Sequence, residues 1–383
     1  MTTEQKLLID TLAIAVAGAQ RQLELDQVDW SAFLHMAQKH SLAPLVWEGL
    51  QKAGVSEQVP SQFQDRWNTL YFKAIYRDAQ MDYTRGLIEE KLVAAGVPHI
   101  FLKGAVLKYD YPVSALRTMG DMDILIHEEK YAELDQMAKE LEAVPEFGDG
   151  NHKNYTFPGG VLVEFHPNFL HHATRISTLI NPGWQYAVQK DGRWELTEEG
   201  FYLFELCHLA SHFTGGGIGV RFILDMWVLR HLRKNKPDME KVEAELERFG
   251  LLEFHNNICR LAEVWFSGEE TDPLMEELGE YILQSGVFGS LGQSALNEVS
   301  LAGNRRKALL RRVFYPRAEM ESRYPWCKGK PWLLPAAWFA RAFTALRLHS
   351  GHIRTWSKGA GQAGAEEVAA QKEKMARFGI SGK

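Results

Sequence analysis

Two short apolar runs, residues 98–104 and 120–126, constrain the fold of this chain more than any other part of the sequence. The first run predicts a buried strand that stops in a tight turn at Lys103 and Gly104, with a helix after it. The start of such a helix offers free backbone N–H groups to an anion. In the second run Asp121 and Asp123 alternate with apolar residues, which predicts a strand with both carboxylates on one face and the core on the other.

Neighbouring carboxylates at a strand end repel each other unless a positive group lies between them, and a divalent metal ion is the usual partner. An isolated Asp-x-Asp is more often a solvated strand end, or an aspartate such as Asp121 that caps a turn. Residues 161–166 favour the metal, because they alternate in the same way and place Glu164 opposite their apolar side chains. If this strand lies beside the aspartate strand, Glu164 completes a site of three carboxylates, with His166 near its rim.

This combination resembles the nucleotidyltransferase superfamily of the DNA polymerase beta type, in particular a group of poorly characterised bacterial nucleotidyltransferase-like proteins. The resemblance extends over most of the chain, and four motifs carry it: Leu102-Lys103-Gly104, Tyr111-Pro112 with Arg117, Asp121 with Asp123, and Glu164 with His166. The wider superfamily usually has Gly-Ser or Gly-Gly at the phosphate turn, where this chain has Lys103-Gly104.

The resemblance implies transfer of a nucleoside monophosphate from a nucleoside triphosphate (NTP) to an acceptor, with release of pyrophosphate. It implies that Asp121, Asp123 and Glu164 bind two Mg²⁺ (or Mn²⁺) ions. It also implies that Lys103 and the Gly104 amide contact the triphosphate, with Arg117 neutralising charge on it. The acceptor stays open between a small molecule, a sugar, a protein side chain and an RNA end. Two other hypotheses are a non-catalytic nucleotide-binding or regulatory module and a nucleic-acid-binding protein.

Four residues further along the chain could also face the active cleft. His208 and His212 are four apart on a predicted helix, which is metal-ligand spacing, but the sequence lacks the Glu of a zinc-protease motif and a third ligand. A hydrogen-bonded histidine pair at a domain interface is the commoner arrangement. Arg221 and Asp225 are likewise four apart, and the plain interpretation is an ion pair within one helix. The resemblance offers another interpretation, because in that superfamily a helical domain often closes over the nucleotide.

The composition is that of an ordinary globular protein, with 383 residues, 45% hydrophobic content and a net charge of −6. The three cysteines are far apart, which indicates neither a disulfide framework nor a cysteine zinc site. We find no export signal and no apolar run long enough for a transmembrane segment. These features favour a reducing, cytoplasmic location.

The charge is distributed unevenly along the chain. Residues 301–360 contain thirteen lysines and arginines against two glutamates, so the rest of the chain is strongly acidic. Such a basic segment suggests a polyanionic partner or an anionic membrane surface. Residues 336–348 predict an apolar helix edged with arginine, which we expect to pack within its domain rather than to lie on a membrane.

The pattern of periodicities divides the chain into four parts and predicts an α+β fold. Residues 1–95 are expected to be a helical region that ends in one or two long helices over 62–95. Residues 96–195 are expected to form a small mixed-sheet nucleotidyltransferase core, which includes a hairpin of residues 154–157 and 161–166. Residues 196–358 predict a helical domain that starts at Thr197. Residues 359–383 predict a flexible tail, either a loosely held helix or disordered.

Overall fold

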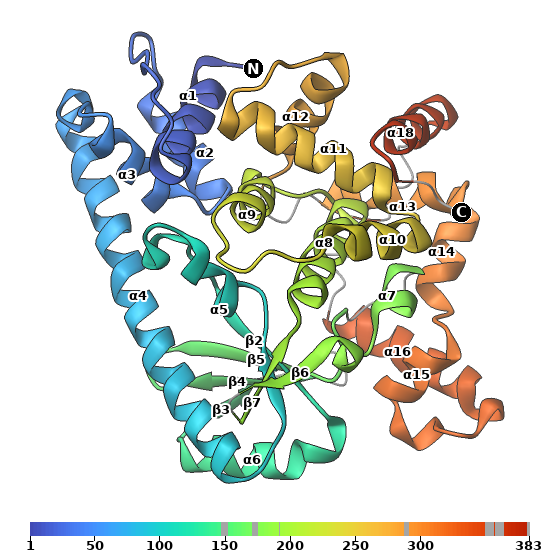
Figure 1. Ribbon diagram of the computed structural model, residues 1–383. Helices are drawn as coiled ribbons and strands as arrows, with labels where there is room; N and C mark the ends of the chain where they lie inside the picture. The colour runs from blue at the N-terminus through green and yellow to red at the C-terminus, as the bar shows by residue number, and fades with distance from the viewer. Residues whose placement is uncertain are drawn as a thin grey trace.

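The computed structural model describes residues 1–146, 152–170, 175–190, 192–286, 291–348, 356 and 364–380. It contains a five-stranded sheet with the order β1-β2-β5-β4-β3, which lies in the lower half of Figure 1 with helices to its left, below and above it. The strands are β1 (His99–Phe101), β2 (Asp121–Ile126), β3 (Val144–Glu146), β4 (Lys153–Phe157) and β5 (Val161–His166). Strands β2 and β5 are parallel and the other neighbours are antiparallel, which confirms the mixed sheet, the hairpin and the α+β class.

The period-two alternation of β2 and β5 gives the sheet two chemically different faces. Met122 and Ile124 of β2, with Val163 and Phe165 of β5, belong to a hydrophobic cluster with α4 (Ser61–Ala94) and α6 (Tyr131–Glu140). The register pairs Asp123 with Glu164, so these carboxylates leave the opposite face together. The predicted two-faced register is therefore confirmed.

The N-terminal region is helical, as expected, and is connected to the sheet by one long helix. Helices α1 (Thr3–Leu12), α2 (Trp30–Lys39) and α3 (Ala43–Lys52) precede α4, which is 34 residues long. Helix α4 ends at Ala94, and Gly96 follows two residues later with a φ of 63°, in the left-handed region that favours glycine. The chain then passes directly into β1.

Beyond the sheet, a hairpin of β6 (Ala187–Lys190) and β7 (Arg193–Leu196) leads into a helical region. Its helices are α8 (Glu198–Gly215), α9 (Val220–His231), α10 (Met239–Phe249), α11 (Leu252–Ala262), α12 (Pro273–Ser285) and α13 (Leu291–Ala302). Helix α8 begins as predicted, because the Thr197 hydroxyl accepts a hydrogen bond from the Gly200 amide at 3.0 Å.

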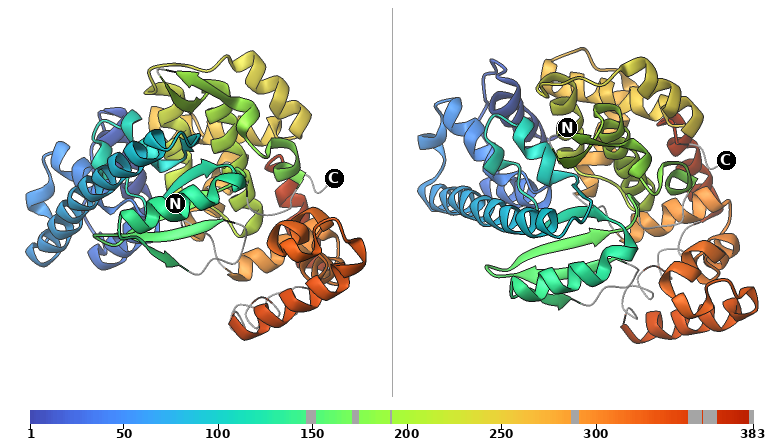
Figure 2. Two further views of the ribbon diagram at one scale, coloured as in Figure 1. Left: turned by 90° about the horizontal axis from the view of Figure 1, so that it is seen from below. Right: turned by 60° about the horizontal axis from the view of Figure 1, so that its bottom comes forward.

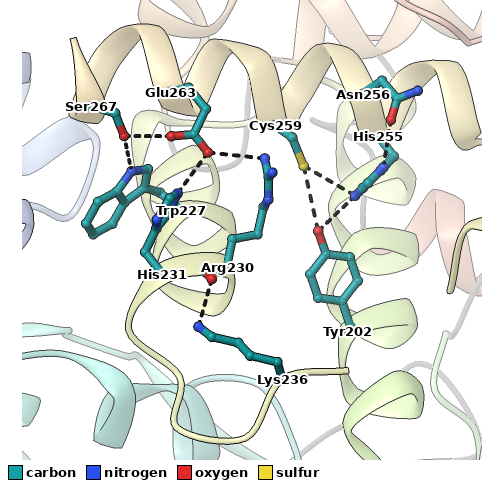
Figure 3. Close-up of polar contacts among 10 residues, drawn as sticks. All are labelled: Tyr202, Trp227, Arg230, His231, Lys236, His255, Asn256, Cys259, Glu263 and Ser267. Carbon is teal, nitrogen blue, oxygen red and sulfur yellow. Dashed lines mark hydrogen bonds and ion pairs between the residues drawn. The ribbon is translucent and has the colours of Figure 1, made fainter. Parts of the chain in front are cut away.

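A network of polar side chains fixes α8 and α9 against α11 and the turn after it (Figure 3). The Tyr202 hydroxyl lies 2.8 Å from His255 Nε2, and Cys259 Sγ lies 3.3 Å from the same nitrogen. A second group joins α9 to the end of α11, where the Glu263 carboxylate contacts His231 at 2.8 Å and Arg230 at 3.2 Å. The Tyr202 group is buried and the Glu263 group is more exposed, and together they tie α8 and α9 to α11.

One large hydrophobic core joins the two ends of the chain. It contains residues of α1 to α3 and of α8 to α12, together with Met375 and Phe378 near the C-terminus. Within the expected flexible tail, residues 364–380 contain α18 (Ala365–Arg377), and this helix packs on α13. Residues 359–363 and 381–383 lie outside the described residues.

The segment after α13 forms a small lobe of α14 (Arg305–Val313), α15 (Arg317–Arg323) and α16 (Leu334–Leu348). The lobe stands at one corner of the molecule in both views of Figure 2. Its own core is small and centres on Met320, Cys327 and Ala337. In the part of the chain that the structure describes, no helix combines the length and apolar character needed to cross a membrane.

Candidate active site

The turn between β1 and α5 (Gly104–Leu107) begins the site. Lys103 has a φ of 48°, an unusual value for a residue with a side chain, and such values often mark functional turns. A Cβ atom at position 104 would lie 2.2 Å from Arg117 Nη1, so only glycine lets the guanidinium approach the turn. The predicted tight turn is confirmed, and its glycine has a steric reason.

Asp123 is the most enclosed carboxylate of the sheet face, with 4% of its surface exposed. Its Oδ1 atom accepts hydrogen bonds from Lys103 Nζ at 2.7 Å and from His166 Nε2 at 2.8 Å. Burial alone would raise the pKa of Asp123, but Lys103 and His166 outweigh burial and hold this pKa below its usual value. Asp123 is therefore an anion at neutral pH.

His166 and Glu164 complete a compact group around Asp123. His166 Nε2 lies 3.5 Å from Glu164 Oε2, and one donor atom from each of the three side chains lies within 4.8 Å of the others. Among the described residues this is the one group of His, Cys, Asp and Glu side chains able to share a metal ion. His166 is buried, and it contacts both Asp123 and Glu164.

Asp121 lies two residues before Asp123 on the same strand face, outside this compact group. Burial and the neighbouring Asp123 charge raise the pKa of Asp121 above its ordinary value. A cation bound next to such a carboxyl group stabilises its ionised form. The structure thus brings Asp121, Asp123 and Glu164 to one face, with His166 added between two of them.

Arg117 is oriented by the helical region. Its Nε and Nη2 atoms donate to the two Asp225 oxygens at 3.1 and 2.8 Å, and the Tyr111 hydroxyl donates to Asp225 at 2.6 Å. Arg117 and Asp225 are both buried. The expected Arg221–Asp225 pair is corrected by this arrangement, because Arg221 instead donates to the Thr118 carbonyl at 3.1 Å.

Arg221 adds positive charge to the same place. Burial and the nearby Arg117 lower the pKa of Arg221 to about 10. Its Nε atom is buried and has no hydrogen-bond partner among the described residues. Arg117 forms the ion pair with Asp225, whereas Arg221 lies close enough to feel both charges without pairing with this carboxylate.

Glu205 of α8 belongs to this region, although the sequence analysis missed it. Its side chain is buried, and its Oε1 atom has no hydrogen-bond partner among the residues described. Burial and Asp225 raise the pKa of Glu205 to about 8, and Lys103 and Arg117 are close enough to oppose that rise. A signal was present in the sequence, since Glu205 interrupts the apolar run of residues 201–207 and a charged residue there needs a reason.

His208 and His212 form a pair rather than part of the carboxylate group. Their Nε2 atoms are 3.0 Å apart, and both rings pack against Phe222 of α9. The expected hydrogen bond between the two histidines is present, and both residues lie on α8. The pair lies on α8 near Glu205 and joins this helix to α9.

Comparison with known proteins agrees with the chemistry of this face. A family model described as an uncharacterised nucleotidyltransferase matches residues 26–267, which is more than half of the chain. No curated protein and no solved structure matches the chain. The matched segment contains the Lys103 turn, both aspartates, Glu164, and helices α8 and α9, and the chain belongs to this nucleotidyltransferase family.

Proposed function

We propose that the protein transfers a nucleoside monophosphate from an NTP to an acceptor hydroxyl or phosphate, releases pyrophosphate, and needs a divalent metal ion. The observation that carries the proposal is the grouping of Asp123, Glu164 and His166 within 4.8 Å on one sheet face, with Asp121 beside them. Family membership supports the general reaction class.

The residues present fit a Mg²⁺ or Mn²⁺ site. Asp121, Asp123 and Glu164 offer carboxylate oxygens, the donors that these ions prefer. Burial and the adjacent Asp123 charge raise the pKa of Asp121, and a bound cation would oppose both effects. When bound, the metal supplies charge neutralisation at the reacting phosphate oxygens.

The chain's own cations act on the triphosphate in this proposal. Lys103 is 2.7 Å from Asp123, at the border between the carboxylates and the turn. Arg117 lies against Gly104 and is fixed by Asp225, so its guanidinium is oriented before a nucleotide arrives. Arg221 adds a second guanidinium. Such fixed cations stabilise charge on a phosphoryl group without reorganising during the reaction.

Glu205 is the candidate for the acceptor side. It comes from α8, whereas the metal-binding carboxylates come from the sheet, so it can approach an acceptor that lies between the two. Its raised pKa of about 8 lets it exchange a proton with an acceptor hydroxyl near neutral pH.

Labelled nucleotides test the reaction class. The protein is incubated with Mg²⁺, a cell extract, and an NTP labelled at either the α or the γ phosphate. We expect label in an acceptor only from the α position, and loss of transfer when Asp121→Asn and Asp123→Asn are combined. Glu269→Gln with Glu270→Gln, an exposed pair far along the chain, is the matched control. Transfer from the γ position, or undiminished transfer by the aspartate variant, would refute the proposal.

A further inference from the structure

The lobe of α14 to α16 carries large apolar side chains on its outside. Leu310, Phe314, Trp326, Trp332, Phe339 and Phe343 are all exposed. Soluble surfaces rarely gather so many aromatic side chains in one small region, and such gatherings usually mark an interaction site. The lobe lies outside residues 26–267, so this surface is separate from the family match and from the proposed function.

Helix α16 is packed against the lobe on one side and exposed on the other. One side of the helix is already packed, since Ala337 is buried and Trp338 Nε1 donates to the Tyr315 carbonyl at 3.0 Å. The other side presents Phe339, 82% exposed, and Phe343, 67% exposed. Our expectation that this helix packs within its domain is therefore correct for one side only.

The same lobe is strongly basic. Residues 301–348 contain eleven lysines and arginines against two glutamates. Exposed cations lie on α14 and on the loop before α16: Arg305, Arg306, Lys307, Arg311, Lys328 and Lys330. Within the described residues, none of these six is in an ion pair, whereas Arg317 pairs with Glu321. Arg354 and Lys358, also part of the basic segment, lie outside the described residues.

We propose that this lobe docks on an anionic lipid bilayer, with Trp332, Phe339 and Phe343 at the headgroup boundary and the lysines and arginines of the lobe on lipid phosphates. Interfacial attachment requires apolar side chains next to cations that attract anionic headgroups. The charge of the lobe disfavours a symmetric contact between the lobes of two copies, because two basic faces would repel each other. Single-stranded nucleic acid would also use the cations and stack its bases on the aromatic rings, but the exposed aliphatic side chain of Leu310 has no ring for stacking and favours lipid.

Vesicle flotation tests this surface. The full chain is mixed with vesicles of phosphatidylcholine and phosphatidylglycerol in equal parts, or of phosphatidylcholine alone. We expect binding to the anionic vesicles that weakens with salt, and little binding to the neutral ones. Phe339→Ser with Phe343→Ser should weaken binding by about tenfold or more.

Helix α4 offers a matched control. Phe72 and Tyr76 are 64% and 67% exposed and also lie four residues apart on a helix, away from the lobe. Phe72→Ser with Tyr76→Ser should leave binding unchanged. Both double variants should retain the melting temperature of the parent, because all four side chains are exposed. Equal loss in the two variants, no binding to anionic vesicles, self-association through the lobe, or preferred binding to RNA would each overturn the proposal.

Discussion

At the scale of single residues, the Oδ1 atom of Asp123 decides how the neighbouring side chains can act. It accepts hydrogen bonds from both Lys103 and His166. His166 thus orients Asp123, and it lies farther from Glu164, at 3.5 Å, than from Asp123, at 2.8 Å. Glu164 lies beside Asp123 in the register and offers a second carboxylate to a metal ion. Glu164 and His166 should therefore differ in importance.

We predict that Glu164→Gln lowers nucleotidyl transfer by several orders of magnitude while the protein stays folded. Removing one of three carboxylates also relieves their repulsion, so the metal-free variant should be at least as stable as the parent. His166→Ala should be milder, about tenfold, the scale of one lost hydrogen bond. Single-turnover rates check this. If His166→Ala lost all transfer activity while Glu164→Gln kept a near-native rate, the histidine and not the glutamate would be essential.

Glu205 gives a prediction about pH. Its folded-state pKa of about 8 lies above the ordinary value of 4.5, so the folded state binds the extra proton between these values. Stability is thus lost as the pH rises from 4.5 towards 8, at most ~1.4 kcal/mol per pH unit. Glu205→Gln removes this loss, so the melting temperature of the variant should rise relative to that of the parent as the pH increases from 6 to 8. A constant difference across that range would show that Glu205 is ionised in the fold.

At the scale of elements, the sequence predicted the strands and helix ends that depend on the spacing of nearby residues. The strand of Asp121 and Asp123, the hairpin that places Glu164, and the cap at Thr197 all follow from alternation or capping chemistry. The contacts of Arg117 could not be predicted in this way. Its partner Asp225 lies 108 residues away, and only the docking of α9 on the sheet brings them together.

His40 at the end of α2 joins this helix to α9 and α12 through hydrogen bonds that depend on pH. Its Nδ1 accepts from the Val220 amide of α9 at 3.3 Å, so the neutral ring donates from Nε2 to the Leu283 carbonyl of α12 at 3.2 Å. Burial lowers the pKa of His40 to about 4. The unfolded chain therefore binds a proton first, and stability is lost as the pH falls from 6.5 towards 4.

We predict that His40→Gln lowers stability at pH 7 but flattens its dependence on acid. The slope of unfolding free energy between pH 6.5 and 4.5 should decrease by up to ~1.4 kcal/mol per pH unit. His35→Gln is the control, because His35 is exposed on the same helix. Urea titrations at several pH values measure the slope. An unchanged slope in His40→Gln would place the acid sensitivity elsewhere, for example at the buried His255.

At the scale of the whole molecule, the shared core explains why the C-terminus matters for stability. The composition of the tail indicated flexibility, but Phe378 is fully buried against Phe213 and Tyr281 of the helical region. We predict that Phe378→Ala destabilises the protein by ~3–5 kcal/mol. Phe339→Ala, at an exposed position, should cost almost nothing. Equal denaturation midpoints for both variants would mean that the tail does not pack on the core.

The metal response of the carboxylate face tests the central claim most directly. The melting temperature is measured with and without Mg²⁺ or Mn²⁺ for the parent, for Asp121→Asn with Asp123→Asn, and for the exposed control Glu269→Gln with Glu270→Gln. We predict a metal-dependent rise in the parent and in the control, because a cation relieves the repulsion among Asp121, Asp123 and Glu164. The rise should vanish in the aspartate variant. A rise of equal size in all three proteins would contradict a metal site on this face of the sheet.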